Sequence, residues 1–269
     1  MPSASSYHQP MQKPLTVVHT SDVHLDSRDA DKATDGFRSR AERAFAGVVD
    51  ATHEVDADLL LIAGDLFDNN RVDGTNIDFV YRQFDRLRCP VVMLPGNHDV
   101  HDESSVWNRF DFDEAGEHVH ALMSHDGNCV TLDEIGARVW GKAMAEHAPE
   151  NYPLVGVPER HDRHWNIGMA HGQVCERRIG QGSSPITREE IRTSGFDYLA
   201  LGHIHVWGDH SEGDTVAVYS GSPVAHFAGA NGGYVAVVNL CPSDGVRVES
   251  RKVTSWDRVM ERSSGGFPF

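Results

Sequence analysis

Five clusters of aspartate, histidine and asparagine carry side chains that bind metal ions and activate water. In Asp22-x-His24 and His203-x-His205 two side chains are two residues apart, so each pair points to one side where the chain is extended. The other clusters are Gly64-Asp65, Gly96-Asn97-His98-Asp99 and His171-Gly172. Imidazole mixed with carboxylate suits Mn, Fe, Zn or Co better than Mg or Ca. The pattern therefore predicts a transition-metal site.

Each cluster follows, within a few residues, a short apolar run of the kind that forms a strand buried on both faces. The runs are Leu15 to Val18, Leu59 to Ala63, Val91 to Leu94, Ile167 to Ala170 and Tyr198 to Leu201. Helical periodicity over 37–49 and 77–87 predicts βαβ crossovers and parallel strands for the first three runs. Because the carboxyl ends of parallel strands share one edge of a sheet, we expect the clusters to converge there.

The rest of the chain completes an α/β fold. Thr187 and Glu190 form a capping box, which predicts a short helix ending near Ser194. After His205 the pattern becomes a β-meander over 216–219, 234–240 and 246–253, which predicts a second, more antiparallel sheet packed on the first. We assign 1–13 to a disordered leader, 14–258 to one domain and 259–269 to a flexible tail.

The ordered clusters resemble the motifs of the calcineurin-like metallophosphoesterase superfamily over residues 15 to 240. This resemblance implies a four-layer αββα sandwich of two mixed sheets with a dinuclear metal site. The longer strings Ser21-Asp22-Val23-His24-Leu25, Gly64-Asp65-Leu66-Phe67-Asp68 and Tyr219-Ser220-Gly221-Ser222-Pro223 are most similar to the Mre11/SbcD-type DNA-repair exonuclease branch.

The resemblance also implies two divalent transition-metal ions, with manganese (Mn2+) favoured over Fe, Zn, Co or Ni. It assigns one ion to Asp22, His24, Asp65 and His205, and the other to Asp65, Asn97, His171 and His203. Asp65 would bridge them, because the two oxygens of a carboxylate can serve two cations. A hydroxide bridging the ions would attack phosphorus in line.

His98 and Asp99 are the predicted catalytic residues that do not bind metal. His98 resembles the family histidine that stabilises or protonates the leaving alkoxide. Asp99 could orient it and keep it charged through a hydrogen bond to the far ring nitrogen.

Three functions fit these residues. The leading one is a phosphodiesterase acting on small or nucleotide-like phosphodiesters. The alternative is an Mre11/SbcD-like DNA exonuclease or endonuclease, although such nucleases continue into a capping module and about 15 residues follow the last predicted strand here. A non-catalytic scaffold of the same fold is least favoured, because every ligand position is filled, as are His98 and Asp99.

Composition bears on the partners. With 24 basic and 40 acidic residues, the formal net charge is −16. Such a field repels polyanions unless a local patch overrides it, so duplex DNA is disfavoured as a partner. No run approaches the ~18 apolar residues of a membrane span, and 1–13 lacks the apolar core of a signal peptide. We therefore predict a cytoplasmic protein without a membrane partner, and a homo-oligomer stays open.

Several residues keep two interpretations. Asp68 and Arg71 could face substrate or belong to a solvated loop, and Arg109 could line a pocket or pack against a helix. His226 follows a turn that either borders the site or only connects strands. The four cysteines show no metal-binding spacing, so we expect free thiols.

Overall fold

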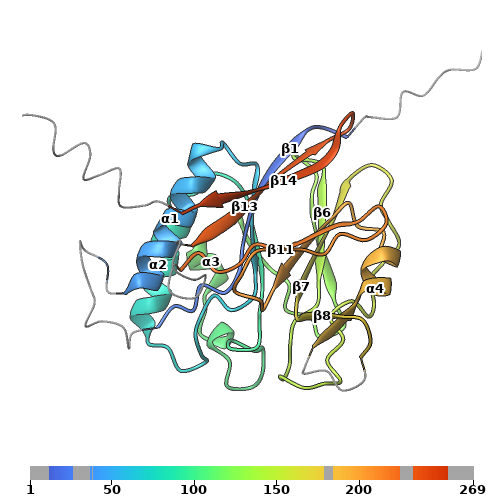
Figure 1. The fold of residues 1–269 in the computed structure, drawn as a ribbon. Coiled ribbons are helices and arrows are strands. Elements are labelled where there is room, and N and C mark those ends of the chain that lie inside the picture. Colours follow the sequence, from blue (N-terminus) through green and yellow to red (C-terminus); the bar gives the residue numbers. More distant parts are fainter. Residues whose placement is uncertain (1–11, 27–36, 38, 179–183, 225–232, 254–269) are drawn as a thin grey trace, which may run out of the picture.

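The structure is a computed structural model that describes residues 12–26, 37, 39–178, 184–224 and 233–253. Two β-sheets pack face to face, with α1, α2 and α3 outside one sheet and α4 outside the other (Figure 1). The predicted α/β sandwich of two mixed sheets is confirmed. Its fourth layer is thin, because α4 has only six residues.

The first sheet has the strand order β14-β13-β1-β2-β3-β4. Its strands are β1 (Leu15–Thr20), β2 (Leu59–Ala63), β3 (Val91–Leu94), β4 (Val119–Ala121), β13 (Tyr234–Cys241) and β14 (Gly245–Lys252). β1 to β4 are parallel, as predicted for the first three, whereas β13 runs antiparallel to both β1 and β14.

The second sheet has the strand order β11-β12-β10-β7-β6-β5. Its strands are β5 (Asn128–Leu132), β6 (Ala137–Gly141), β7 (Trp165–His171), β10 (Tyr198–Gly202), β11 (Gly208–Asp209) and β12 (Val216–Tyr219), and a separate pair is formed by β8 (Gln173–Cys175) and β9 (Pro185–Thr187). The predicted grouping of 216–219, 234–240 and 246–253 in one sheet is wrong. β12 lies parallel to β10, while β13 crosses to pair with β1.

Helix boundaries follow their caps. α1 (Arg40–Glu54) begins later than the apolar periodicity, because the Ser39 side chain accepts a hydrogen bond from the Glu42 amide. α2 (Gly74–Phe84) is capped by Asp73 in the same way. The predicted capping box of Thr187 and Glu190 is confirmed at the start of α4 (Arg188–Thr193). A 3-10 turn, Val106–Asn108, and α3 (Phe112–Ala115) precede β4.

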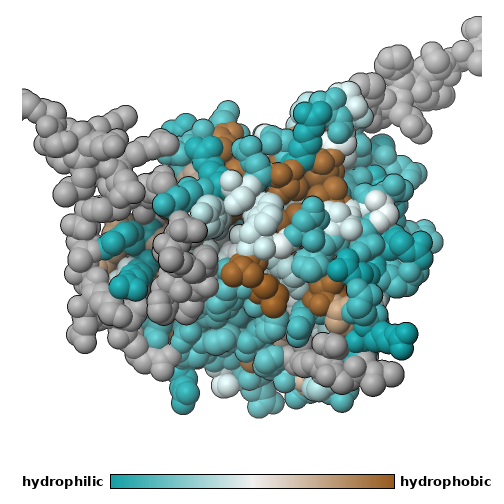
Figure 2. Space-filling view, viewed as in Figure 1, coloured by the Kyte–Doolittle hydropathy of each residue, from teal (hydrophilic) through white to brown (hydrophobic). Residues whose placement is uncertain are grey.

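Three apolar layers hold the sandwich together. Along β2, Leu60 and Ile62 pack toward the helices, while Leu59 and Leu61 pack between the sheets. Because both faces of β2 are buried in this way, every residue of the strand is apolar. A third cluster, including Phe196, covers the outside of the second sheet. On the face shown in Figure 2, the hydrophobic residues form small groups separated by hydrophilic ones.

The chain ends lie largely outside the described residues, as do most of the predicted leader and all of the predicted tail. Gln12 and Lys13, assigned to the leader, are exceptions, since Gln12 Nε2 donates to the His164 carbonyl at 3.0 Å and the Lys13 carbonyl accepts a hydrogen bond from Trp165 Nε1 at 2.7 Å. The four cysteines are free thiols, as expected. Among the helices of the described part, none has the length and apolar character needed to cross a membrane.

The layer between the sheets predicts the effect of truncating Leu61, which is 0% exposed. We expect Leu61→Ala to lower the free energy of unfolding by about 2–5 kcal/mol, because it leaves a cavity in a closed layer. Val155→Ala is the control, since Val155 is 48% exposed. Denaturant unfolding of the metal-free protein measures both. Equal losses in the two variants would contradict this packing.

Candidate metal centre

The seven predicted ligands meet at the edge of the sandwich where the strands β1, β2, β3, β7 and β10 end. The first sheet supplies Asp22, His24, Asp65 and Asn97, and the second supplies His171, His203 and His205. The expected convergence is therefore observed. It involves both sheets, because β7 and β10 belong to the second one.

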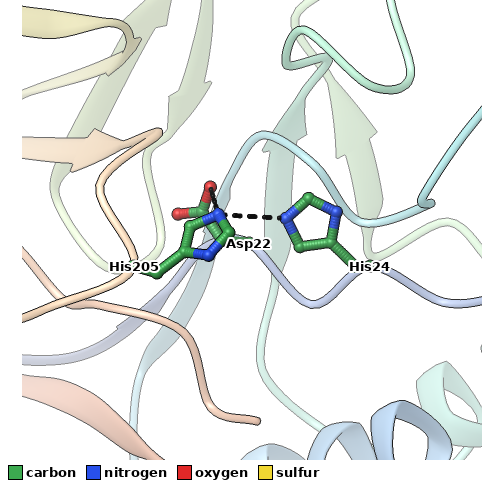
Figure 3. Close-up of side chains that lie close together, drawn as sticks. All are labelled: Asp22, His24 and His205. Carbon is green, nitrogen blue, oxygen red and sulfur yellow. Dashed lines mark hydrogen bonds and ion pairs between the residues drawn. The ribbon is translucent and has the colours of Figure 1, made fainter. Parts of the chain in front are cut away.

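A first group of ligand atoms comes from Asp22, His24 and His205 (Figure 3). The Nε2 atoms of the two histidines lie 3.2 Å apart. His205 Nε2 is 3.6 Å from Asp22 Oδ1, and His24 Nε2 is 3.8 Å from Asp65 Oδ2. Two ring nitrogens and two carboxylate oxygens thus face a common point, as the ligands of one cation would.

A second group forms around the Asn97 side chain. Its Oδ1 atom lies 3.0 Å from His171 Nε2 and 2.8 Å from His203 Nδ1. His171 Nε2 is also 3.3 Å from Asp65 Oδ2. The other ring nitrogen of His171 donates to the Ala63 carbonyl at 2.9 Å, which directs Nε2 toward the carboxylate.

Asp65 joins the two groups, but through one oxygen. Oδ2 faces both His24 and His171, whereas Oδ1 accepts a hydrogen bond from the His98 amide at 2.8 Å. Oδ2 is therefore the oxygen that both groups approach, while Oδ1 also holds the backbone of the neighbouring loop.

The backbone at these ligands is unusual. Four of them have positive φ, a region that L-residues rarely adopt and that costs on the order of 1–3 kcal/mol each. They are Asp22 (φ 55°), His24 (54°), Asp65 (53°) and His203 (98°). Strain of this kind persists only where the surrounding structure imposes it, and the sequence carried no signal for it.

Glycine lets the loops approach one another closely. A Cβ atom on Gly202 would lie 1.9 Å from the Ala63 carbonyl oxygen, and one on Gly96 would lie 2.2 Å from Asp65 Oδ1. Gly64 has φ +89°, and a Cβ there would meet the His171 ring. These three glycines therefore let β2, β3 and β10 bring their ligands within reach of one another.

Burial shapes the charges of the site. Asp22 is 0% and Asp65 1% exposed. Burial alone would lower the pKa of His171, but Asp65 and Asp22 raise it to about 9. Burial would also raise the pKa of Asp65, and the neighbouring His171 and His24 hold it well below its usual range instead. Burial lowers the pKa of His203 to about 4. Asp65 thus stays charged, and its charge stabilises a proton on His171.

His98 lies at the edge of the site, with its side chain 43% exposed. The predicted hydrogen bond between the His98 ring and the Asp99 carboxylate is wrong. The Asp99 carboxylate accepts from the amides of Gly96 at 2.7 Å and Phe67 at 3.1 Å, and burial raises its pKa to about 7. The loop turns this side chain inward, so that it braces the backbone of the two loops.

Asp68 takes the place expected of Asp99. Its carbonyl accepts a hydrogen bond from His98 Nδ1 at 2.8 Å, and its Oδ1 is 3.3 Å from His24 Nδ1. Asp68 therefore lies against the site rather than in a solvated loop, while its contact with substrate stays a prediction. The signal in the sequence was its position three residues after Asp65, in the same loop.

Three further residues had two interpretations, and the structure describes two of them. Arg109 donates to the carbonyls of Asn70 and Val72, so it holds this loop, and it also lines an open surface pocket together with residues 108 and 110–113. Arg71 is exposed. His226 lies outside the described residues.

The donor set fits a pair of divalent transition-metal ions. Each group combines imidazole nitrogens with carboxylate or amide oxygens, which is the mixture that Mn, Fe, Co and Zn accept. Several of these side chains already have their other polar atoms held by backbone groups, as in metal sites whose ligands are oriented in advance.

Comparisons with known proteins agree with this geometry. Residues 15–207 match the calcineurin-like phosphoesterase family. The uncharacterized metallophosphoesterase YhaO of Bacillus subtilis is 30% identical over 229 residues, which are 78% of this chain and 53% of that protein. The DNA double-strand break repair protein Mre11 of Methanopyrus kandleri is 24% identical over 78% of this chain and 49% of its own.

Two further similarities complete the comparison. One of the subunits of the nuclease SbcCD of Bacillus subtilis is 22% identical over 91% of this chain and 69% of its own. The chain thus spans about half the length of YhaO and of this Mre11. A dimetal phosphatase from Danio rerio superposes with a TM-score of 0.59 at 11% identity, over 89% of this chain and 96% of that one, which supports the fold.

The state of His171 predicts how metal binding depends on pH. In the metal-free protein its pKa of about 9 keeps it protonated near neutral pH, whereas an ion requires a free Nε2 atom. We expect Mn2+ binding near neutral pH to release protons, since against the effect of burial Asp68 and Asp65 raise the pKa of His24 too, and the affinity to increase as the pH rises toward 9.

Titration calorimetry in buffers of different ionisation enthalpy measures this proton release. In His171→Asn the buffer dependence should shrink, because that side chain has no such proton to lose. Heats that are independent of the buffer in the unmodified protein would contradict the prediction.

Proposed function

Because the chain belongs to the calcineurin-like phosphoesterase family, we propose that it is a metal-dependent phosphodiesterase with two ions in its site. Its substrates are small or nucleotide-like phosphodiesters. One observation carries the proposal, namely that two groups of ligand atoms share the single oxygen Asp65 Oδ2.

The first group would hold one ion and the second group the other. Manganese is favoured, and Fe, Zn, Co or Ni fit the same donors. When bound, two such ions supply positive charge for the phosphoryl oxygens and lower the pKa of a water molecule to near neutrality. The four positive charges of two ions exceed the three negative charges of the Asp22, Asp65 and Asp68 carboxylates, so the loaded site attracts an anionic phosphodiester although the chain carries −16.

His98 is the proposed acid for the leaving group. Its Nδ1 atom donates to the Asp68 carbonyl, so Nε2 is the nitrogen that can deliver a proton to a substrate oxygen. Its backbone amide is bound to Asp65, which fixes the distance between this acid and the proposed bridging carboxylate. Asp68 contacts both His24 and His98, and so it keeps the acid beside the first ligand group.

A DNA nuclease is the second candidate, because relatives named for Mre11 and SbcCD match the chain. The charge distribution favours small substrates instead. Among the described residues, several arginines are already paired with Asp or Glu side chains, which reduces their attraction for phosphates. They are Arg86, Arg160, Arg178, Arg188, Arg192, Arg247 and Arg251.

Replacing the proposed acid should separate metal binding from chemistry. His98→Ala keeps the backbone amide that binds Asp65, so we expect both ions to remain while kcat falls about 10²- to 10⁴-fold. The loss should be smaller with a nitrophenolate leaving group, which needs no proton. Elemental analysis and steady-state kinetics measure this, with the exposed His125→Ala as the control. Equal losses for activated and unactivated leaving groups would disprove the acid role.

The choice of substrate should follow the charge of the chain. We expect Mn2+-loaded protein to hydrolyse bis-nitrophenyl phosphate or cyclic nucleotides with weak salt dependence, and to bind little duplex DNA at ~150 mM salt. Hydrolysis assays and fluorescence anisotropy with labelled duplex across a salt series test this. Micromolar binding that falls steeply with salt, together with degradation from DNA ends, would establish the nuclease instead.

A further inference from the structure

We propose that the buried serines Ser21 and Ser222 are positioning residues for the first metal ion, the one assigned to Asp22, His24, Asp65 and His205. This inference rests on the proposed function and gives a role to two serines that are not among the seven proposed ligands. Both serines are fully buried, as is their neighbour Ser220. Both hydroxyls donate to Asp22, which Figure 3 shows beside His205.

Ser21 selects the oxygen that Asp22 offers. Its hydroxyl donates to Asp22 Oδ2 at 2.5 Å, and the His203 amide lies 3.1 Å from both carboxylate oxygens. Oδ2 is therefore occupied by the hydroxyl, and Oδ1 is the oxygen directed at His205 Nε2, 3.6 Å away. Without the hydroxyl, the carboxylate loses the bond that distinguishes its two oxygens.

Ser222 joins ligands from different sheets. Its hydroxyl donates to the Asp22 carbonyl at 2.7 Å, and its amide donates to the His205 carbonyl at 3.0 Å. The hydroxyl also accepts from the Val224 amide at 3.1 Å, so its orientation is fixed. Asp22 has φ 55°, and this bond helps to hold its strained backbone in place.

Ser220 provides a matched control. Its Oγ atom is 3.3 Å from Ser21 Oγ and 3.0 Å from the Gly221 carbonyl. Because the single proton of Ser21 is used for Asp22, Ser220 must donate in the first contact, and it has only one proton for two acceptors. Its support for Ser21 is thus divided. Ser220→Ala removes an equally buried hydroxyl with a weaker connection to the ligands.

The test is Mn2+ and Co2+ titration of the full chain, by calorimetry and by Co2+ absorption. Asp22→Ala and Asn97→Ala serve as references for loss of the first and of the second ion. We expect Ser21→Ala to bind the first ion about 10- to 100-fold more weakly and the second ion unchanged. Its residual Co2+ spectrum should match that of Asp22→Ala, and kcat should fall with little change in KM. Ser220→Ala should lose less.

Ser222→Ala should likewise bind the first ion more weakly and the second ion unchanged. If Ser21→Ala does not fold, Ser222→Ala alone tests the inference. The inference would be overturned if the folded serine variants bound two ions with unchanged affinity. It would also be overturned if they lost the ion that Asp22→Ala retains. Either result would leave the proposed function intact. Fewer than two ions in the unmodified protein would overturn both.

Discussion

Two carboxylates buried at the junction of the sheets set the conditions for everything around them. An ionised carboxylate removed from water costs on the order of several kcal/mol unless positive or hydrogen-bonding partners surround it. Asp65 receives the amide of His98 and the ring of His171, and Asp22 receives the amide of His203 and the hydroxyl of Ser21. The loops are therefore arranged largely in the way that brings these partners to the two carboxylates.

The position of the site between two sheets ties cation binding to the sandwich itself. Asp65 comes from one sheet and His171 from the other, so an ion that holds both also resists separation of the sheets. Free energy gained on binding therefore adds to the stability of the folded chain. In the metal-free protein, the protonated His171 ring attracts the Asp65 carboxylate and so links the two sheets in part.

How much could be read from the sequence depends on how local each signal is. Apolar runs followed by polar clusters are local, so the buried strands and the residues that gather at their ends could be predicted. Strand pairing is not local, and β13 was assigned to the wrong sheet because packing selects β1 as its partner. The partner of His98 was mistaken for the same reason. Asp99 adjoins it in sequence, but the turn of the loop sends that carboxylate to backbone amides and leaves Asp68 beside the ring.

Asp22, His24, Asp65 and His203 have left-handed backbone conformations, so each combines backbone strain with a side chain of the proposed site. At each position glycine would relieve the backbone strain, while the side chain that it removes is a proposed ligand. At Asp22 and Asp65 glycine would also remove the carboxylates that accept the loop amides of His203 and His98, so there the strain is the lesser cost. A designer who wants the same sandwich without the proposed site would begin instead with His24 and His203, where glycine relieves strain and removes no buried carboxylate.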